Sequence, residues 1–518
     1  MAQETELKLS LRARDLPRLL AHPLLRPLAA RREHLFNTYF DTPTQALMQR
    51  RIAVRERRVG RRTLLTVKTA GTSVGGLSRR GEWEGPTRAG ALDFAALVDD
   101  PALAQELTRL AWQLVPVFRT DFTRRSWLLH HGGALIEVAL DEGAITTGHT
   151  PGTPQGTQRE PILELELELQ SGPVDALLDL AHTLALGPEG DAARGLWLHP
   201  SDRSKAERGL ALFQGQRLQP VKAGPVLLAP DMPPRAAFRA AALSCLAHLQ
   251  ANVAGLLQAR DPQTLPDPEF IHQARVALRR LRTGLRLFGP ALPRRFASHW
   301  SAQWKATANR LGDARNWDVL ATEWLPELLG EANDAPSDPQ TQALRDWVNA
   351  ERRAAHQRAL ATLTDPAHAL NLLAFTRALL ALAPPKHRRA ARPLPGWARS
   401  TLRQQHARLR RQARQALRQG SEGRHALRIQ LKKLRYAQEF LASLLPAKRL
   451  RRSTAALTEA QERLGSLNDL NTALALLGSC PLPAAHDLRE KVQARLGDGL
   501  RALPRLERTL MNTPTPWG

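Results

Sequence analysis

The stretch ILELELEL, residues 162–169, alternates apolar and acidic residues from Leu163 to Leu169. Successive side chains of a β-strand point to opposite faces, so this period of two places the glutamates on one face and the aliphatic residues on the other. The stretch ETELKLSL, residues 4–11, repeats the pattern with charges of both signs. The charged residues that share a face in the two stretches are Glu164, Glu166 and Glu168, and Glu4, Glu6 and Lys8.

Strand patterns of this kind fill most of residues 1–170, and they are joined by short turns. Such a series predicts a closed antiparallel barrel or a strongly curved sheet. Helical patterns around 91–115, 173–185 and 202–213 are expected to cover its outside, whereas the Gly-, Pro- and Thr-rich stretch 143–160 is expected to be a mobile loop. The eight predicted strands are 4–11, 37–40, 52–58, 63–68, 80–84, 118–129, 134–140 and 162–169.

The charged face of these strands has two interpretations. For any single strand, a solvated outer face opposite an apolar core is the more common arrangement. Both signs of charge recur on strand after strand, however, and amphipathic helices are at hand to cover an apolar exterior. We therefore expect the charged residues to line a tunnel. Carboxylates there would hold a hard divalent cation such as Mg²⁺, and Arg and Lys would hold phosphate oxygens.

The chain of 518 residues has a net charge of +25, and the excess lies in its C-terminal part. Residues 1–208 contain 27 basic and 26 acidic residues, which leaves 47 basic and 23 acidic residues for 209–518. A field of this sign concentrates polyanions. The two cysteines are too few for a disulfide framework or a zinc site, and we expect them to be thiols in a reducing cytoplasm. No uninterrupted apolar run is long enough to span a bilayer, and the acidic N-terminus does not resemble a secretory signal.

The organisation changes after residue 213. Residues 214–232 lack periodicity and contain several Pro and Gly residues, which is typical of a linker. Residues 233–513 have helical spacing and contain an internal repeat at an offset of 153 residues, since the segment from His272 to Arg282 matches the one from His425 to Arg435. The predicted fold class is therefore an α+β multidomain protein, with an eight-stranded antiparallel β tunnel (1–213) and an all-α domain of two duplicated helical bundles (233–385 and 393–513).

Each repeat carries a basic stripe along one helix face. At 100° per residue, offsets of 0, 3, 7 and 10 fall within roughly 80° of one another. Neither motif contains an acid, and like charges so arranged favour a polyanionic partner over a merely solvated face. The candidate polyanion-binding residues are His272, Arg275, Arg279, Arg280, Arg282 and Arg286 in the first repeat, and His425, Arg428, Lys432, Lys433 and Arg435 in the second.

The N-terminal part resembles the CYTH family of triphosphate tunnel metalloenzymes. The resemblance rests on an ordered series of motifs across about 205 residues. The motifs are Glu4-Thr-Glu6-Leu-Lys8, Tyr39-Phe-Asp41-Thr42, Arg55-Glu-Arg57, a strand ending in Lys68, Arg80-Gly-Glu82-Trp-Glu84, Phe122-Thr-Arg124, Glu137 with Asp141, Glu164-Leu-Glu166-Leu-Glu168, and Ser204-Lys205-Ala-Glu-Arg208-Gly209.

This resemblance implies a tunnel that hydrolyses or cyclises triphosphate compounds with Mg²⁺ or Mn²⁺. It leaves open which carboxylate acts as the base. By this resemblance, the residues that bind the triphosphate are Lys8, Arg55, Arg57, Lys68, Arg80, Arg124 and Lys205. The residues that bind metal or orient the attacking water are, by the same resemblance, Glu4, Glu6, Glu137, Asp141, Glu164 and Glu166. The catalytic set is Glu4, Glu6, Lys8 and Lys68.

The helical part resembles the CHAD domain, a module commonly found after CYTH domains. The histidine-led basic signature occurs in both repeats, and the segment from Leu311 to Val319 matches a second family motif. The resemblance implies polyphosphate binding. Nucleic acid is possible but disfavoured, because recognition of single strands uses exposed aromatic residues and the stripes contain none beyond Tyr436.

The leading hypothesis is a cytoplasmic inorganic triphosphatase that cleaves tripolyphosphate to pyrophosphate and phosphate and holds polyphosphate on its helical domain. Association with polyphosphate granules is a further expectation, and no membrane partner is expected. Two alternatives stay open: a triphosphate-binding protein without turnover, and a nucleotide-acting enzyme, either an adenylate cyclase or a thiamine triphosphatase. No P-loop, GxSxG or HExxH motif competes with these hypotheses.

Overall fold

A computed structural model shows the chain as two compact units. The first contains Met1–Gln219 together with Thr364–Ala381, and the second contains Pro220–Leu363 together with Leu382–Gly518. Helix α13 (Pro366–Leu380) therefore belongs to the first unit, although the predicted repeat 233–385 includes it. The structure describes residues 2–148, 158–187, 190–258, 264–330, 338–382, 393–416 and 420–517.

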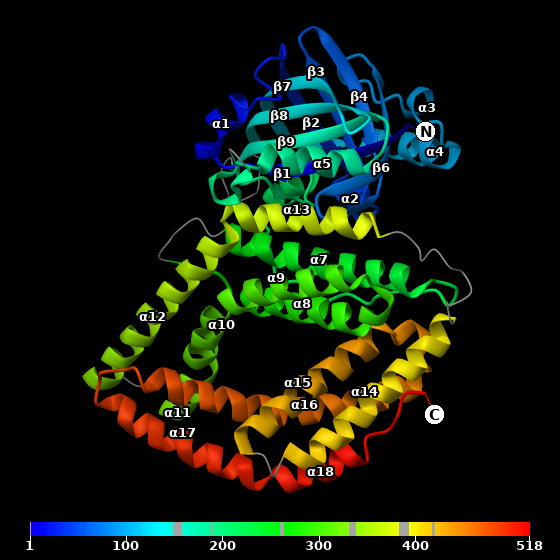
Figure 1. The fold of residues 1–518 in the computed structure, drawn as a ribbon. Helices are drawn as coiled ribbons and strands as arrows, with labels where there is room; N and C mark the ends of the chain where they lie inside the picture. The colour runs from blue at the N-terminus through cyan, green and yellow to red at the C-terminus, as the bar shows by residue number, and fades with distance from the viewer. Residues whose placement is uncertain are drawn as a thin grey trace. The chain divides into compact units, whose positions relative to one another are not determined.

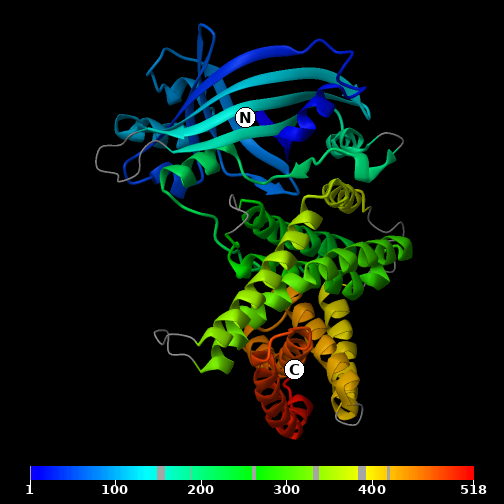
Figure 2. The same ribbon diagram turned by 90° about the vertical axis from the view of Figure 1, so that its left-hand side faces the viewer.

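The first unit is built on a closed antiparallel barrel (Figures 1 and 2), which confirms the predicted fold. Neighbouring strands follow the order β1-β9-β8-β7-β2-β3-β4-β6, and β6 pairs back onto β1, where Glu4 lies opposite Arg80. Two short strands, β5 (Thr72–Val74) and β10 (His199–Pro200), add to β6 and β1. The eight long strands are β1 (Ala2–Ser10), β2 (Arg31–Asp41), β3 (Ala53–Val59), β4 (Arg62–Lys68), β6 (Leu77–Pro86), β7 (Val115–His131), β8 (Ala134–Thr147) and β9 (Arg159–Ser171).

The predicted loop 143–160 is wrong at both of its ends. Strand β8 continues to Thr147 and β9 begins at Arg159, with Thr146 paired to Arg159. Gly143 lies inside β8 because of a close approach: a Cβ there would lie 2.1 Å from the backbone oxygen of Asp121. Glycine in a strand can thus mark tight contact between backbones rather than a break. Residues 149–157 of the predicted loop lie outside the described residues.

The apolar faces of the strands point outward, beneath helices. Leu7, Val138 and Leu165 are fully buried against α5 (Asp175–Ala185), and Leu373 of α13 belongs to the same core. Figure 1 shows α5 and α13 side by side along this face of the barrel. A second core lies under α3 (Phe94–Leu97) and α4 (Pro101–Leu110), and a third lies under α6 (Lys205–Phe213). Since the strands alternate, the charged faces point into the barrel.

Short helical segments complete the first unit. Two of them, α1 and α2, escaped prediction because they are too short to show a helical period. These segments are η1 (Ala13–Asp15), α1 (Leu16–Leu20), α2 (Ala46–Gln49), η2 (Ala111–Gln113) and η4 (Ala192–Arg194).

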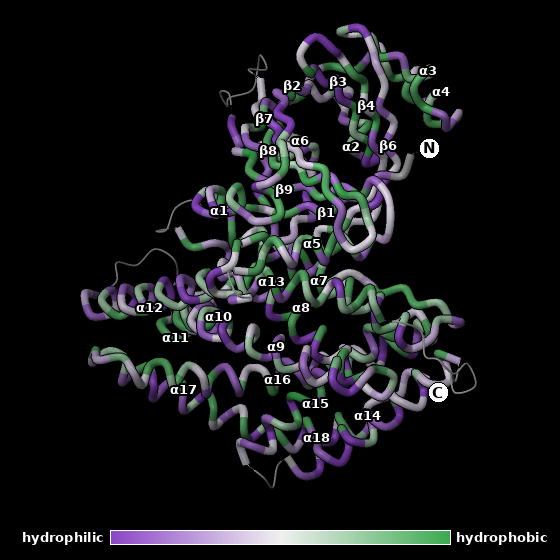
Figure 3. Tube along the Cα trace, turned by 45° about the horizontal axis from the view of Figure 1, so that its top comes forward, coloured by the Kyte–Doolittle hydropathy of each residue, from purple (hydrophilic) through white to green (hydrophobic). Residues whose placement is uncertain are grey.

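The second unit is helical throughout its described elements. In Figure 3, hydrophilic and hydrophobic segments alternate along most of these helices, as expected where one face of a helix is buried. The repeated helices α8 and α15 pack against each other. The helices are α7 (Pro234–Leu257), α8 (Pro268–Leu287), η5 (Gly289–Ala291), α9 (Arg294–Arg310), α10 (Gly312–Val319), the π-helical η6 (Leu320–Trp324), α11 (Leu325–Leu329), α12 (Pro339–Leu363), α14 (Leu394–Ala416), α15 (Gly420–Phe440), η8 (Ala442–Leu444), α16 (Ala447–Leu477), α17 (Ala484–Arg501) and α18 (Leu503–Met511).

Among the described residues, α7 is the one helix whose length and composition match those of a membrane span. The apolar window that meets this test is 61% buried inside the structure. A core helix packed on several sides has the same composition, because hydrophobic residues then surround the whole helix.

Candidate active site

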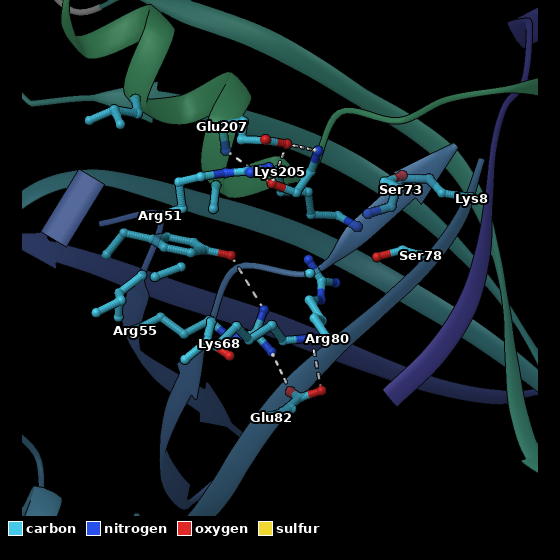
Figure 4. A pocket seen from close by; sticks show the side chains of 18 of the residues that line it. Lys8, Arg51, Arg55, Lys68, Ser73, Ser78, Arg80, Glu82, Lys205 and Glu207 are labelled. Carbon is cyan, nitrogen blue, oxygen red and sulfur yellow. Dashed lines mark hydrogen bonds and ion pairs between the residues drawn. The ribbon is translucent and has the colours of Figure 1, made fainter. Parts of the chain in front are cut away.

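The barrel encloses a cavity of about 760 Å³ whose walls carry charges of both signs (Figure 4). Strands β1, β3, β4, β6, β7 and β9 and helix α6 all contribute side chains to it. The seven residues predicted to bind triphosphate all line it: Lys8, Arg55, Arg57, Lys68, Arg80, Arg124 and Lys205. Of the six predicted metal ligands, Glu4, Glu6 and Glu166 line the cavity, whereas Glu137, Asp141 and Glu164 are not among its lining residues.

One acidic group lies where β8 and β9 meet α6. Asp141, Glu164 and Glu166 are buried, and each offers an oxygen within 4.8 Å of the others. Lys205 Nζ lies 2.7 Å from Asp141 Oδ2 and 3.0 Å from Glu166 Oε1, and it also contacts Glu164. Arg124 donates two 2.7 Å hydrogen bonds to Asp141 and a third, of 2.5 Å, to Glu166. The group therefore couples three acids to two cations.

The capping of α6 brings Lys205 to this group. Ser204 and Glu207 form a capping box, so the helix begins at Lys205 and directs its side chain inward. Gly209, one turn later, faces Phe118 so closely that a Cβ would lie 2.2 Å from the ring. Any larger residue would move α6 away from the barrel and Lys205 away from the acids.

A second acidic group lies around β1 and β6. Lys68 Nζ is 3.0 Å from oxygens of Glu4 and of Glu82. Arg80 donates to Glu4 at 2.9 Å and to Glu6 at 2.5 Å. Burial alone would raise the pKa of Glu4, but the charges of Lys68 and Arg80 hold it far below its usual value.

Glu168 lies next to this second group and lacks comparable compensation. Burial, together with the charges of Glu4 and Glu137, raises its pKa to about 7. Glu137 lies directly opposite Glu168 on β8. The predicted carboxylates thus form two groups on neighbouring walls rather than a single cluster.

The donor set fits a hard divalent cation. All candidate ligands are carboxylate oxygens, the type that Mg²⁺ and Mn²⁺ prefer. The 4.8 Å spread within Asp141, Glu164 and Glu166 is close to what metal–oxygen distances of about 2.0–2.6 Å require, provided that Lys205 Nζ, which contacts all three acids, moves from between them. Burial and the charges of Glu4 and Glu137 raise the pKa of Glu168, and a cation bound beside it would favour its ionised form.

The cations on the opposite wall are held in fixed positions. Arg55 Nη1 donates to Tyr39 Oη at 3.3 Å, and its guanidinium lies 3.5 Å from Glu84. Arg57 donates to Asn37 Oδ1 at 3.0 Å. Burial and the neighbouring Arg55 lower the pKa of Arg57 to about 10, so repulsion between the two cations is only partly compensated. An anion between them would remove it.

Two positions in this wall were not predicted as site residues. Tyr39 is buried against Phe118 and presents its hydroxyl to Arg55. Its signal was present in the Tyr39–Thr42 motif, but an aromatic residue in a strand more often belongs to a core. Thr66 donates to Glu84 at 2.6 Å. Asp41 of the same motif is structural, because it accepts hydrogen bonds from backbone N–H groups of Thr42 and of α2.

In the second unit, α8 and α15 bring part of each basic stripe together. Burial, Arg279 and Arg428 lower the pKa of Lys432 to about 6. Burial and the neighbouring arginines lower the pKa of His272 to about 3. They also lower the pKa of Arg275, to about 10. Positive charge from both repeats, which Asp313 and Asp469 offset only in part, therefore converges on one region. Arg315, which was not predicted, belongs to it and is the largest charge acting on His272.

Other stripe residues lie outside this convergence. Arg282, Arg286 and Lys433 form a neighbouring basic group, in which burial and Arg286 lower the pKa values of Arg282 and Lys433. The prediction for Arg280 conflicts with its burial: it is 2% exposed, packs over Phe440 and lies 3.5 Å from Glu439. Arg435 forms an ion pair with Glu439 and donates a hydrogen bond to Gln461.

A closed tunnel with charged walls, followed along the chain by a basic helical unit, defines a two-domain tunnel-barrel protein. Comparison with protein families identifies both parts. Residues 2–196 match the CYTH domain and residues 240–478 match the CHAD domain. The chain therefore belongs to the proteins that join a CYTH domain to a CHAD domain, as the motifs predicted.

Individual relatives are more distant. An inorganic triphosphatase of Haemophilus influenzae is 34% identical over 228 residues, which are 42% of this chain and 57% of that protein. The chain thus spans little more than half the length of this curated relative. The CHAD domain of Ricinus communis is 26% identical, with a TM-score of 0.48, over 57% of this chain and 99% of that one. A putative adenylyl cyclase from Hippeastrum, described as having a dominant triphosphatase activity, is 19% identical over 42% of this chain and 97% of its own, with a TM-score of 0.29.

Proposed function

We propose that the first unit hydrolyses inorganic triphosphate to pyrophosphate and phosphate with Mg²⁺ or Mn²⁺. The observation that carries the proposal is the convergence of seven cations and several carboxylates on one enclosed cavity of about 760 Å³. The cations can bind the oxygens of a linear phosphate chain, and the carboxylates can bind the divalent cation that accompanies it. The similarity to the Haemophilus influenzae inorganic triphosphatase supports this choice of substrate.

In this mechanism the arginines and lysines bind and orient the substrate. Arg55 and Arg57 offer planar guanidinium groups that bind phosphate oxygens in pairs. Lys8 and Lys205 stay protonated, because carboxylates beside them raise their pKa values despite burial. Fixed cations stabilise the charge that develops on the transferred phosphoryl group, which is the main requirement of this reaction.

The two acidic groups would hold the metal. Asp141, Glu164 and Glu166 would bind it on one wall, and Glu4 and Glu168 would do so on the other. A bound divalent metal supplies a water of lowered pKa and neutralises the leaving phosphate oxygens. The barrel walls, closed by hydrogen bonding from β6 to β1, keep the reacting groups at fixed separation and limit the access of bulk water.

The test measures phosphate release by the purified full-length chain from tripolyphosphate, ATP and thiamine triphosphate, each with Mg²⁺, Mn²⁺ or EDTA. We expect metal-dependent turnover that is fastest with tripolyphosphate. Faster turnover of ATP or thiamine triphosphate would favour a nucleotide-acting or thiamine-acting enzyme, and tight binding without turnover would favour a binding protein.

Arg57 and Arg58 provide a matched pair for this assay. They are adjacent on β3, but Arg57 lines the cavity, whereas Arg58 is exposed and packs over Phe36. Arg57→Ala should lower kcat/KM by about 100-fold or more, which is the range for losing a charged hydrogen bond to the transition state. Arg58→Ala should change it less than twofold. Equal effects would remove the tunnel as the site of reaction.

We further propose that the second unit binds inorganic polyphosphate through the convergent cations of α8 and α15. The lowered pKa values of Lys432, Arg275 and His272 support this, because burial and neighbouring cations outweigh the partial compensation by Asp469 and Asp313. Tyr436 is buried, so it offers no platform on which a nucleic-acid base could stack. A phosphate chain without bases is the partner that suits this surface.

Binding to long-chain polyphosphate should fall steeply with salt, because counterions are released. Replacing Arg275, Arg279, Arg428 and Lys432 together by Ala should weaken binding and reduce the salt slope by roughly 3 to 4. The control removes the same charge from exposed arginines elsewhere in the unit. Equal affinity for DNA of matched charge would instead indicate a general polyanion binder. The control positions are Arg353, Arg358, Arg403 and Arg489.

A further inference from the structure

Arg51, on the turn between α2 and β3, has an unfavourable backbone conformation. Its φ is 57°, in the left-handed region that L-residues other than glycine, asparagine and aspartate rarely adopt. Its backbone N–H donates to Met48 O at 2.8 Å, and Ile52 N donates to Leu47 O at 2.9 Å, so the turn itself is well bonded. Glycine would satisfy the same turn without steric cost. The arginine therefore needs a reason beyond the backbone.

The position of its side chain gives a reason for an arginine here: Arg51 lines the tunnel cavity and is exposed to solvent (Figure 4). Each of the seven cations described above has a carboxylate within 4.0 Å; for example, Arg57 Nη1 lies 3.3 Å from Glu84. Among the residues that the structure describes, Arg51 forms no such ion pair. Its charge can meet an incoming anion without first displacing an acid.

Neighbouring residues show that this arrangement is specific to Arg51. Arg50 pairs with Glu106 on α4 and does not line the cavity. Gln45 is the other described non-glycine residue with a positive φ, of 58°, and its side chain accepts a hydrogen bond from Gln214. The left-handed backbone of Gln45 thus accompanies a formed contact within the fold. That of Arg51 directs an unpaired guanidinium into the cavity.

We propose that Arg51 is a further substrate-binding residue, which holds the outer phosphate of the linear phosphate substrate where the cavity meets solvent. The inference rests on the proposed function of the tunnel. Residues such as Arg55 and Lys205 are buried and would contact the inner phosphates, whereas Arg51 is exposed and sets affinity for the end of the chain that faces outward. Strain retained at a binding site in return for a contact with ligand is a recognised arrangement.

The test is Arg51→Gly in the full-length protein, with tripolyphosphate as substrate. Glycine removes the charge and relieves the backbone, so the melting temperature should stay equal or rise. KM should increase about three- to tenfold, as for the loss of a partly exposed charged contact, while kcat changes less than twofold. Arg51→Lys should keep part of the affinity.

Two control variants isolate the side chain. Arg50→Ala removes an adjacent cation that faces away from the cavity, and Gln45→Gly relieves the other left-handed residue; each should leave KM within twofold of the parent. An unchanged KM in Arg51→Gly would overturn the proposal. So would a clear fall in melting temperature, which would show that the arginine supports the fold.

Failure of the proposed function has a different signature. If the parent protein does not release phosphate from tripolyphosphate, the hydrolase proposal fails, and the comparison moves to calorimetric binding of tripolyphosphate. Weaker binding by Arg51→Gly than by the parent would still support the assignment of Arg51, whereas equal binding would end it.

Discussion

Replacing Lys205 by Met should both destabilise the barrel and make its stability depend on metal. Lys205 is 6% exposed and contacts Asp141, Glu164 and Glu166, so its loss leaves buried carboxylates short of a counter-charge. Removing one partner of a buried ion pair costs about 3–5 kcal/mol. Arg124 still neutralises part of the group, so we expect the lower end, about 3 kcal/mol.

For a unit of this size each kcal/mol lowers the melting temperature by about 2–4 °C, so the expected decrease is about 6–12 °C in EDTA. A divalent cation should then occupy the place of the lost ammonium group. Millimolar Mg²⁺ is therefore expected to raise the melting temperature of Lys205→Met more than that of the parent. Phosphate release should be lost in either condition, because a substrate contact is gone.

The assay is differential scanning fluorimetry of the full-length protein in EDTA and in increasing Mg²⁺, with Lys205→Arg as the charge-preserving control. A decrease below about 2 °C in EDTA would show that the carboxylates do not depend on Lys205, which would refute the charge argument. A melting temperature of Lys205→Met that does not respond to Mg²⁺ would refute the assignment of these acids as metal ligands.

Three further predictions concern other parts of the chain. Asp41→Asn weakens the hydrogen bonds to the N-terminal turn of α2 and should cost about 1–2 kcal/mol, measured by urea unfolding. Leu373→Ala removes a fully buried side chain through which α13 packs on the barrel, and it should lower the stability of the first unit by about 2–5 kcal/mol and with it the melting temperature of that unit. Arg353→Ala, a change at an exposed position of α12, should leave that melting temperature unchanged. The pKa of Lys432, about 6 in the free protein, should rise when polyphosphate binds, so binding takes up protons at pH 7–8 and weakens as pH increases. Calorimetry in buffers of different ionisation enthalpy measures this uptake, and equal heats in all buffers would contradict it.

The barrel could be predicted from sequence because its strands alternate so regularly. Alternation alone did not say which face is inside, and that answer depended on charges of both signs recurring from strand to strand. Strands β8 and β9 were predicted too short. Residues such as Thr146 and Arg159 pair through their backbone groups, and their side chains do not alternate between apolar and polar, so the sequence pattern does not show that they belong to strands. Glycines such as Gly143, which permit close contact, were interpreted as loop residues for the same reason.

The site was predicted less completely than the fold. Side chains shared by one strand, such as Arg55 and Arg57, could be grouped, but the division of the acids into two walls depends on the curvature of the whole barrel. Arg280 lies one residue from Arg279 and thus about 100° around the helix, so helical geometry places it away from the stripe. Arg51 carries no sequence signal, because its role follows from a backbone angle and the lack of a partner.

Helix α13 has a consequence for how this protein can be divided. The chain leaves the tunnel unit after Gln219, returns to it between Thr364 and Ala381, and then leaves again. A gene fragment that stops at the linker would encode a barrel without one of its outer coverings, and the apolar side chains beneath Leu373 would then meet water. A protein engineered to contain the barrel alone must therefore keep α13, or another element must cover the apolar surface on which α13 packs.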